Sequence, residues 1–392
     1  KSSTNSAKKM LFNDALYEIF LCLELFEVLG ILEVCQTWYE AFYATTHELK
    51  LSTFHASNSK HYEKFLQFLL RFDHINSLSI SFCRQFTDES LDSLSDKFCK
   101  TLQQLTLKST SIDTPNFSKF NELQVLVLTR NKDLQEIVLE NNPKLKTLAI
   151  ESAGLTDLQF EKLFDKLKSV QTDKYGSKGI KFESLSLRNC KNFGFLPEFG
   201  LKSYITEQKL GKTISYLDLS STAIHTEQLN KLVGKDICPL LSILKIEFCF
   251  MLKGQIDLRS SNVNKLYSNK SRMSRILLNS KTCAISEMDI SGTNILGLQF
   301  VALLYGCHKS IENLKFNSGR NTMGVIPLQD NGDSYDISVF VHPGSFVCEK
   351  LTKLSFGYNY FQAAVNEVCY VAPNLHSIYL EATNVIGDCN FG

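Results

Sequence analysis

The residue types that most often carry out chemistry are scattered in this chain, without a catalytic or metal-binding arrangement. Its 8 histidines and 12 cysteines contain no CxxC pair, no Cys/His block at zinc-ligand spacing and no HExxH motif. The histidines are His47, His55, His61, His74, His225, His308, His342 and His376. Phosphate-binding glycine loops and GxSxG turns do not occur either. We therefore expect a non-catalytic protein with no metal ion and no cofactor.

One short pattern recurs along most of the chain from Ile75 onward. It consists of an apolar residue, two others, an apolar residue, one other, an apolar residue, two others and then Asn, Cys or Thr. The matches are Ile75–Cys83, Leu102–Thr110, Leu123–Asn131, Leu145–Ala153, Phe182–Cys190, Ile214–Thr222, Leu241–Cys249, Ile285–Thr293, Ile311–Gly319, Leu351–Asn359 and Leu375–Thr383. Alternating apolar residues predict short strands, and parallel stacking of these strands would bury the apolar side continuously.

This pattern resembles the leucine-rich repeat, LxxLxLxx(N/C), over roughly four fifths of the chain. The resemblance implies an α/β solenoid with parallel strands inside and helices outside. The ninth position must satisfy backbone groups in the turn, and it holds Asn131, Asn359, Cys83, Cys190 and Cys249. Apolar residues at helical spacing follow Thr156, a candidate N-cap, and predict one of the outer helices.

The strand positions between the leucines are the candidate binding residues. In the early repeats they are small and nearly uncharged, whereas the later ones carry both charge signs and tyrosines. The predicted substrate-binding residues are Tyr216, Asp218, Lys245, Glu247, Glu287, Asp289, Lys315, Lys353 and Tyr379. Such a mixed surface suits a protein partner better than a polyanion. For any single residue, a solvated strand position is the alternative.

The spacing of the repeats is irregular, so we expect a solenoid at 51–392 with insertions at 253–283 and 317–349. The basic run from Lys265 to Lys281 favours a solvated loop with a short helix over a nucleic-acid site, because Tyr267 is its only aromatic residue. The match at Leu134–Asn142 lies too close to its neighbours to be a full turn. We expect it to form the back of one repeat.

The stretch from Leu11 to Phe42 differs from the repeats. Leu16, Ile19, Phe20 and Leu23 occupy one face of a helix, and Leu25, Val28, Leu29 and Leu32 repeat this spacing on a second. Val34, Trp38 and Phe42 define a third helical face. Three helices this short carry more apolar surface than their own core can bury, so a partner is expected to cover the rest.

These residues resemble the F-box, whose pattern LPxELLxxIFxxL is followed by an acidic-Leu pair and VCxxW. The resemblance implies a small all-α unit at 1–50 that docks on Skp1 and through it on a cullin. The Skp1-binding residues would be Leu11, Phe12, Leu16, Ile19, Phe20, Leu23, Val28, Leu29, Val34, Cys35 and Trp38. Phe12 departs from the family because Pro usually stands there. A plain helical cap on the solenoid is the alternative, although it does not require the VCxxW ending.

Together the two resemblances imply the substrate-recognition subunit of an SCF-type E3 ubiquitin ligase, with the repeats binding a protein target. The alternative is a leucine-rich-repeat scaffold subunit of a larger assembly, with or without Skp1 and outside ubiquitination. The formal charge of +1 disfavours a nucleic-acid partner, and no apolar run reaches membrane-spanning length. Scattered, reduced cysteines favour the cytoplasm or the nucleus.

Overall fold

The computed structural model describes residues 46–51, 59–140, 142–169, 183–194, 212–295, 297–317, 346–357 and 371–381. All the predicted Skp1-binding residues, from Leu11 to Trp38, lie outside these ranges. The described chain divides into two compact units. The first contains described residues of 46–154 and 162–169, and the second contains 155–161 and the described residues from 183 onward.

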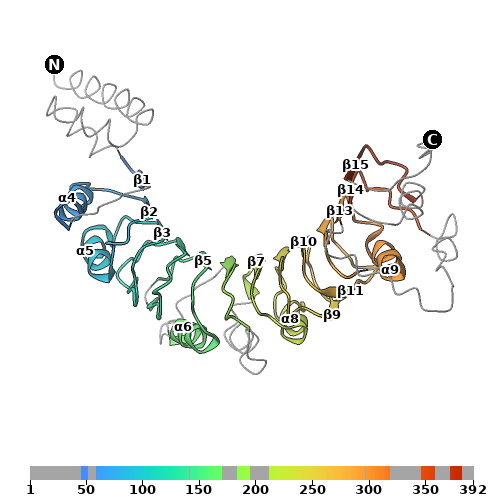
Figure 1. Ribbon diagram of the computed structural model, residues 1–392, viewed down its shortest axis with the longest axis horizontal. Coiled ribbons are helices and arrows are strands. Elements are labelled where there is room, and N and C mark those ends of the chain that lie inside the picture. The colour runs from blue at the N-terminus through green and yellow to red at the C-terminus, as the bar shows by residue number, and fades with distance from the viewer. Residues whose placement is uncertain are drawn as a thin grey trace, which may run out of the picture. The chain divides into compact units, whose positions relative to one another are not determined.

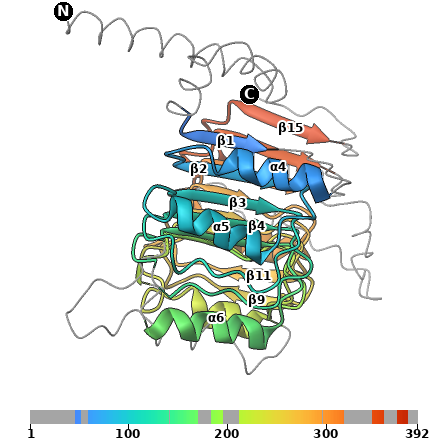
Figure 2. The same cartoon turned by 90° about the vertical axis from the view of Figure 1, so that its left-hand side faces the viewer.

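The first unit is a parallel sheet with helices on one side. Its strands are β1 (Glu48–Leu51), β2 (Ser77–Ser81), β3 (Gln104–Lys108), β4 (Val125–Thr129) and β5 (Thr147–Glu151), paired in chain order. The helices α4 (Ser59–Leu69) and α5 (Asp88–Phe98) pack on the same side of it (Figures 1 and 2). Leu78, Leu105 and Leu126 are in register and fully buried. The alternating apolar side chains of successive strands therefore form one side of a continuous core.

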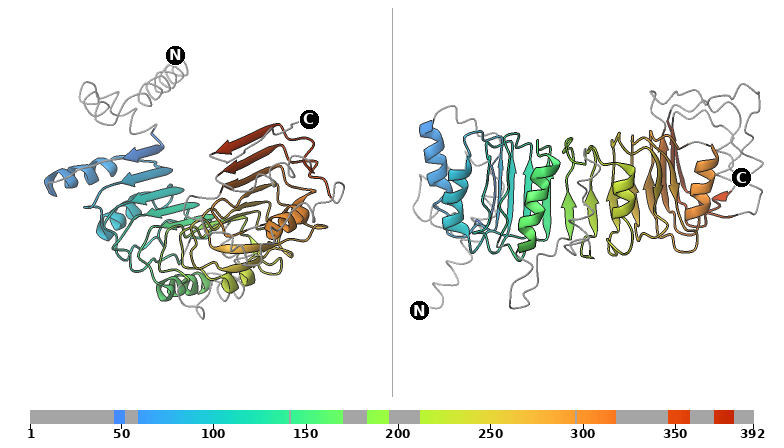
Figure 3. Two further views of the ribbon diagram at one scale, coloured as in Figure 1. Left: turned by 45° about the vertical axis from the view of Figure 1, so that its right-hand side comes forward. Right: turned by 90° about the horizontal axis from the view of Figure 1, so that it is seen from below.

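The second unit repeats this arrangement. Its main sheet has the parallel order β6 (Ser184–Ser186), β7 (Tyr216–Asp218), β8 (Ile243–Lys245), β10 (Lys265–Tyr267), β12 (Glu287–Asp289), β13 (Asn313–Asn317), β14 (Lys353–Gly357) and β15 (Ser377–Glu381). The helices are α8 (Thr226–Leu232) and α9 (Gly297–Cys307), and α6 (Asp157–Ser169) begins in this unit. Figure 3 shows α8 and α9 on the same side of the sheet. The predicted α/β leucine-rich-repeat solenoid is confirmed.

The turn after each strand works as the repeat pattern predicts. The buried Asn131 side chain accepts hydrogen bonds from the Thr110 N–H and hydroxyl, both at 2.9 Å, and donates to the Leu107 carbonyl at 3.0 Å. Cys249 takes the equivalent place, and its Sγ lies 3.1 Å from the Leu219 carbonyl oxygen. Both side chains therefore satisfy a carbonyl of the preceding repeat. The same role predicted for Asn359 lies outside the described residues.

The residue before this turn position has a left-handed backbone in repeat after repeat. The series is Phe82, Ser109, Arg130, Ser152, Asn189, Ser221, Phe248, Lys270 and Gly292, with φ between 54° and 67°. This conformation directs the N–H to the next strand: Phe82 donates to the Lys108 carbonyl at 2.7 Å and Arg130 donates to the Glu151 carbonyl at 2.8 Å. The ladder of hydrogen bonds thus continues one step beyond the strands while the chain turns away.

The predicted insertion at 253–283 is wrong over its described length, which folds into strands. It contains β10 in the main sheet and the two-stranded sheet of β9 (Gly254–Asp257) and β11 (Met273–Leu277). No helix forms between Lys265 and Lys281. Residues 263–271 are a full repeat in which the buried Ser268 replaces the last leucine and donates to the Asp289 carbonyl at 3.1 Å. Because Ser268 replaces this leucine, the sequence pattern did not identify residues 263–271 as a repeat.

The segment around Val138 forms a bridge with Asn116 and buries Leu134, Ile137 and Leu139, which confirms that it forms the back of one repeat. Strand β1 crosses the predicted boundary at residue 50, so strand pairing begins at Glu48. The second predicted insertion lies outside the described residues except at its ends. Among the described helices, none is both long and apolar enough to cross a membrane.

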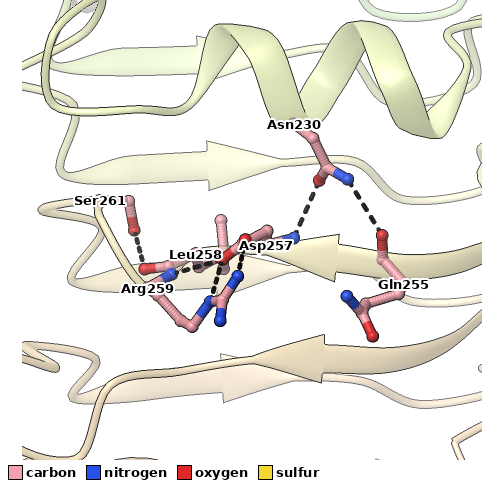
Figure 4. Close-up of polar contacts among 6 residues, drawn as sticks. All are labelled: Asn230, Gln255, Asp257, Leu258, Arg259 and Ser261. Atoms are coloured by element: carbon pink, nitrogen blue, oxygen red, sulfur yellow. Dashed lines mark hydrogen bonds and ion pairs between the residues drawn. The ribbon is translucent and has the colours of Figure 1, made fainter.

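Asn230 of α8 secures the edge of the small sheet. Its Oδ1 accepts a hydrogen bond from the Asp257 N–H at 2.8 Å and its Nδ2 donates to the Gln255 carbonyl at 3.1 Å (Figure 4). One amide side chain therefore satisfies a donor and an acceptor that strand β9 leaves unpaired. The Arg259 guanidinium binds the Asp257 carboxylate at 2.6 Å, and this hydrogen bond lowers the pKa of Asp257.

Candidate protein-binding face

Five neighbouring strands of the second unit, from β7 to β13, place six of the nine predicted binding residues in two rows. Parallel pairing aligns Tyr216, Ile243, Lys265, Glu287 and Asn313 in the first row. The second row is Asp218, Lys245, Tyr267, Asp289 and Lys315. Because successive side chains of a strand point to opposite sides, these rows lie on the side away from the buried leucines. We call them the polar face.

Lys245 lies between two tyrosine rings on the polar face. Its Nζ is 5.4 Å from the ring centroid of Tyr216 on β7 and 5.3 Å from that of Tyr267 on β10. Attraction between the ammonium and the two ring faces restrains all three side chains. The face therefore offers a pre-ordered aromatic surface, so its own side chains lose less conformational entropy when a protein partner binds.

Tyr267, Lys265 and Glu287 form a hydrogen-bonded group beside this surface. Lys265 Nζ lies 3.0 Å from Glu287 Oε2, and Tyr267 also hydrogen-bonds to Glu287. Burial alone would raise the pKa of Glu287, but the hydrogen bonds from Lys265 and Tyr267 outweigh it and leave the pKa lowered. Burial, with the neighbouring carboxylate, raises the pKa of Tyr267 to about 12. Glu287 is thus ionised and Tyr267 is neutral near pH 7.

Two of the predicted binding residues have a structural task. Asp218 is only 2% exposed, and its Oδ1 accepts a hydrogen bond from the Ser220 N–H at 2.9 Å. Asp289 Oδ1 accepts the equivalent hydrogen bond from the Ser291 N–H at 3.0 Å. Each carboxylate therefore lies at the end of its own strand and accepts a hydrogen bond from the backbone N–H two residues later. Burial makes Asp218 a poor contact for a partner, contrary to the expectation of an open strand position.

Glu247 completes the polar face on the turn after β8. Burial is the main cause that raises its pKa, and the charges of Asp218 and Asp289 add to the effect. Arg188 and Lys245 act in the opposite direction without cancelling it. An ionised Glu247 is therefore held in an unfavourable place in the free protein.

Replacing Glu247 by glutamine should raise the midpoint of thermal unfolding slightly at neutral pH, by less than about 2 °C. The folded pKa lies above the unfolded value, so the ionised form costs stability at high pH. This cost disappears when the pH falls below both values, because the carboxyl is then neutral in both states. Thermal melts across a pH series would check this. Glu227→Gln, at an exposed position of α8, should show no gain; an equal gain there would contradict the local explanation.

The remaining predicted residues extend the polar face toward the C-terminal strands. Lys315 on β13 is exposed, and its charge helps to lower the pKa of Glu287. Lys353 on β14 is also exposed, and Tyr379 on β15 is 64% exposed. Ser355 separates Lys315 from Tyr379 in the second row, so these residues are near neighbours rather than one contact group.

Sequence reasoning missed Lys265 and Tyr267, although both belong to the centre of the polar face. Their spacing around Leu266 was the available signal, because Lys-Leu-Tyr after Val263 fits the strand part of the repeat. In the first unit, by contrast, the equivalent row reads Ser79, Thr106, Val127 and Ala149 and carries no charge.

No cluster of potential metal ligands occurs in the part of the chain that the structure describes.

No protein-family model matches the chain, and no curated protein matches it either. Similar solved structures include an internalin (InlF) of Listeria monocytogenes, at 12% identity and a TM-score of 0.42 over 86% of this chain and 91% of that one. Rad7, solved with Elc1 in yeast, has 15% identity and a TM-score of 0.43 over 99% and 90%. The leucine-rich-repeat domain of LRIM1 has 14% identity and a TM-score of 0.34 over 65% and 77%.

At these identities and TM-scores the similarities do not bear on partners or activity. The fold assignment depends instead on the chain's own features: parallel strands in register, buried leucines, and Asn131 and Cys249 in the turns. These features identify a leucine-rich-repeat solenoid with a polar, aromatic face on its second unit.

Proposed function

We propose that the chain is a non-catalytic substrate-recognition subunit of an SCF-type E3 ubiquitin ligase. Leu11–Phe42 would dock on Skp1, and the polar face would bind a protein target. The chain would contribute proximity and orientation, because the transfer of ubiquitin is carried out by partner proteins. The protein-binding role is supported most directly by Lys245 held between Tyr216 and Tyr267.

The composition of the polar face favours a protein target over a polyanion. Tyrosines are enriched where protein interfaces are strongest, and they lose little conformational entropy on binding. Lys245 and Lys265 are already engaged by Tyr216, Tyr267 and Glu287, so they are not free to neutralise a run of phosphates.

Attachment to Skp1 is tested by combining Ile19→Asp with Trp38→Ala and co-expressing the chain with Skp1. We expect wild type to elute as a one-to-one complex in size-exclusion chromatography with light scattering. The double variant should weaken this complex by more than about 100-fold, because a charge replaces a central apolar contact and the aromatic anchor is lost.

A matched control introduces the same charge on the solenoid. Leu158 on α6 is 55% exposed and lies outside the F-box-like stretch. Leu158→Asp should therefore leave the Skp1 complex intact. Continued co-elution of the Ile19/Trp38 double variant with Skp1 would count against the docking assignment.

The second candidate function is a scaffold subunit of a larger assembly, with or without Skp1, that takes no part in ubiquitination. Phe12, in the place of the usual proline, is the feature that favours it. A wild-type chain that stays monomeric in the presence of Skp1 would support this candidate and would leave the protein-binding face unaffected.

A further inference from the structure

Two aromatic–cation pairs join the turn after β8 to the turn after β10. The Nζ atom of Lys270 lies 5.2 Å from the ring centroid of Phe248. The Cζ atom of Arg272 lies 5.6 Å from the ring centroid of Phe250. In each pair the ring belongs to one repeat and the cation to the next. We call these four residues the cation–aromatic edge.

The backbone holds the edge in place. The Phe248 N–H donates to the Asn269 carbonyl at 2.7 Å, and the Lys270 N–H donates to the Ser291 carbonyl at 2.7 Å. Phe248 and Lys270 both have φ of 55°, so the two turns have the same conformation. The side chains are therefore presented by a rigid turn and restrained by their pairing, which reduces the entropy cost of binding.

The edge is exposed and its positive charge is not balanced locally. Phe250 is 54% exposed. The cations Lys253, Lys270, Arg272 and Arg275 are all exposed, and the segments 248–253 and 268–275 contain no Asp or Glu. No ion pair joins any of these four cations to a carboxylate within the described ranges. A carboxylate-bearing partner would supply the missing counter-charges.

We infer that the cation–aromatic edge binds a short acidic segment of a protein partner. Carboxylates of the segment bind Lys270 and Arg272, and an apolar side chain of the segment packs on Phe250. Arg272 offers two parallel N–H donors to a carboxylate, while Phe250 provides an apolar contact beside it. This surface shares no residue with the polar face, although Glu247 of that face directly precedes Phe248 in the chain. Its binding of an acidic segment does not depend on the function proposed above.

A nucleic acid fits this edge less well than an acidic peptide. Sequence-independent binding of a single strand uses a run of aromatic side chains on which successive bases stack, whereas this edge consists of two rings, each paired with a cation. A nucleic acid also gains affinity by neutralising many phosphates, whereas the segments 248–253 and 268–275 supply four cations.

The test uses a fluorescein-labelled peptide in which Glu and Asp alternate with Phe and Leu, titrated with the full chain and followed by fluorescence anisotropy. Combining Lys270→Ala with Arg272→Ala should weaken binding at least about tenfold, and Phe250→Ala about threefold. Thermal melts identical to wild type would show that both variants fold. The same peptide with Gln and Asn in place of the acidic residues should not bind.

A matched control removes two positive charges elsewhere in the second unit. Lys231 and Lys235 are exposed at and beyond the end of α8, and their double alanine variant should bind the acidic peptide like wild type. Unchanged binding by the edge variant, or an equal loss in the control, would overturn the inference. So would an oligothymidylate that binds more tightly than the peptide and is lost in the edge variant, because the edge would then be a nucleic-acid site.

Discussion

Replacing Asn131 by alanine should lower the free energy of unfolding by about 3 kcal/mol. Asn131 is 1% exposed. Its side-chain amide accepts hydrogen bonds from the Thr110 N–H and hydroxyl and donates one to the Leu107 carbonyl. Alanine would leave these buried groups without partners, which costs much more than losing a solvent-exposed hydrogen bond. Urea unfolding followed by circular dichroism would measure the change, and hydrogen exchange at Thr110 would locate it.

A cysteine at this position provides a graded comparison. Cys249 occupies the equivalent turn position, where its Sγ contacts the Leu219 carbonyl. Asn131→Cys should therefore restore the donor to Leu107 and only a weak sulfur contact to Thr110, because Cys249 Sγ lies 3.9 Å from the hydroxyl of the equivalent Thr222. The loss should be smaller than that of alanine. Asn262→Ala removes a hydrogen bond to the Pro239 carbonyl at an exposed site and should cost less than about 1 kcal/mol. Equal losses at Asn131 and Asn262 would refute the role of the buried amide.

Replacing Gly194 by alanine should cost about 1–2 kcal/mol for a left-handed backbone and a further about 1–3 kcal/mol for overpacking. Gly194 has φ of +82°, and a Cβ atom there would lie 2.7 Å from the Cα of Ile224. That neighbour is backbone, so it has little freedom to move. The Gly194 N–H also donates to the buried Asp157 carboxylate at 2.6 Å, which links this turn to the start of α6.

Gly254 separates the two contributions. Its φ of +80° is nearly the same, but a Cβ atom there would meet nothing within 4 Å. Gly254→Ala should therefore cost only the conformational part, about 1–2 kcal/mol. Thermal or urea unfolding of both variants would give the difference directly. Equal costs at Gly194 and Gly254 would mean that the close approach to Ile224 contributes nothing.

The interior of the solenoid was predictable from the sequence because each strand carries its own signal. Leu105 and Leu107 alternate with polar residues, and alternation by itself decides which side of a strand is buried. Asn131 was predictable for the same local reason, since its turn must satisfy backbone groups. The repeat at 263–271 was not predicted, because Ser268 stands where the pattern requires a leucine.

The sequence by itself determined the fold class, the buried leucines, the turn residues and the resemblance of Leu11–Phe42 to an F-box. Only the tertiary structure decided which side chains meet across strands and turns. Lys245 meets Tyr216 and Tyr267, and Arg272 meets Phe250, because parallel pairing brings successive repeats into register. Such contacts join residues a whole repeat apart, so no local pattern of residues encodes them.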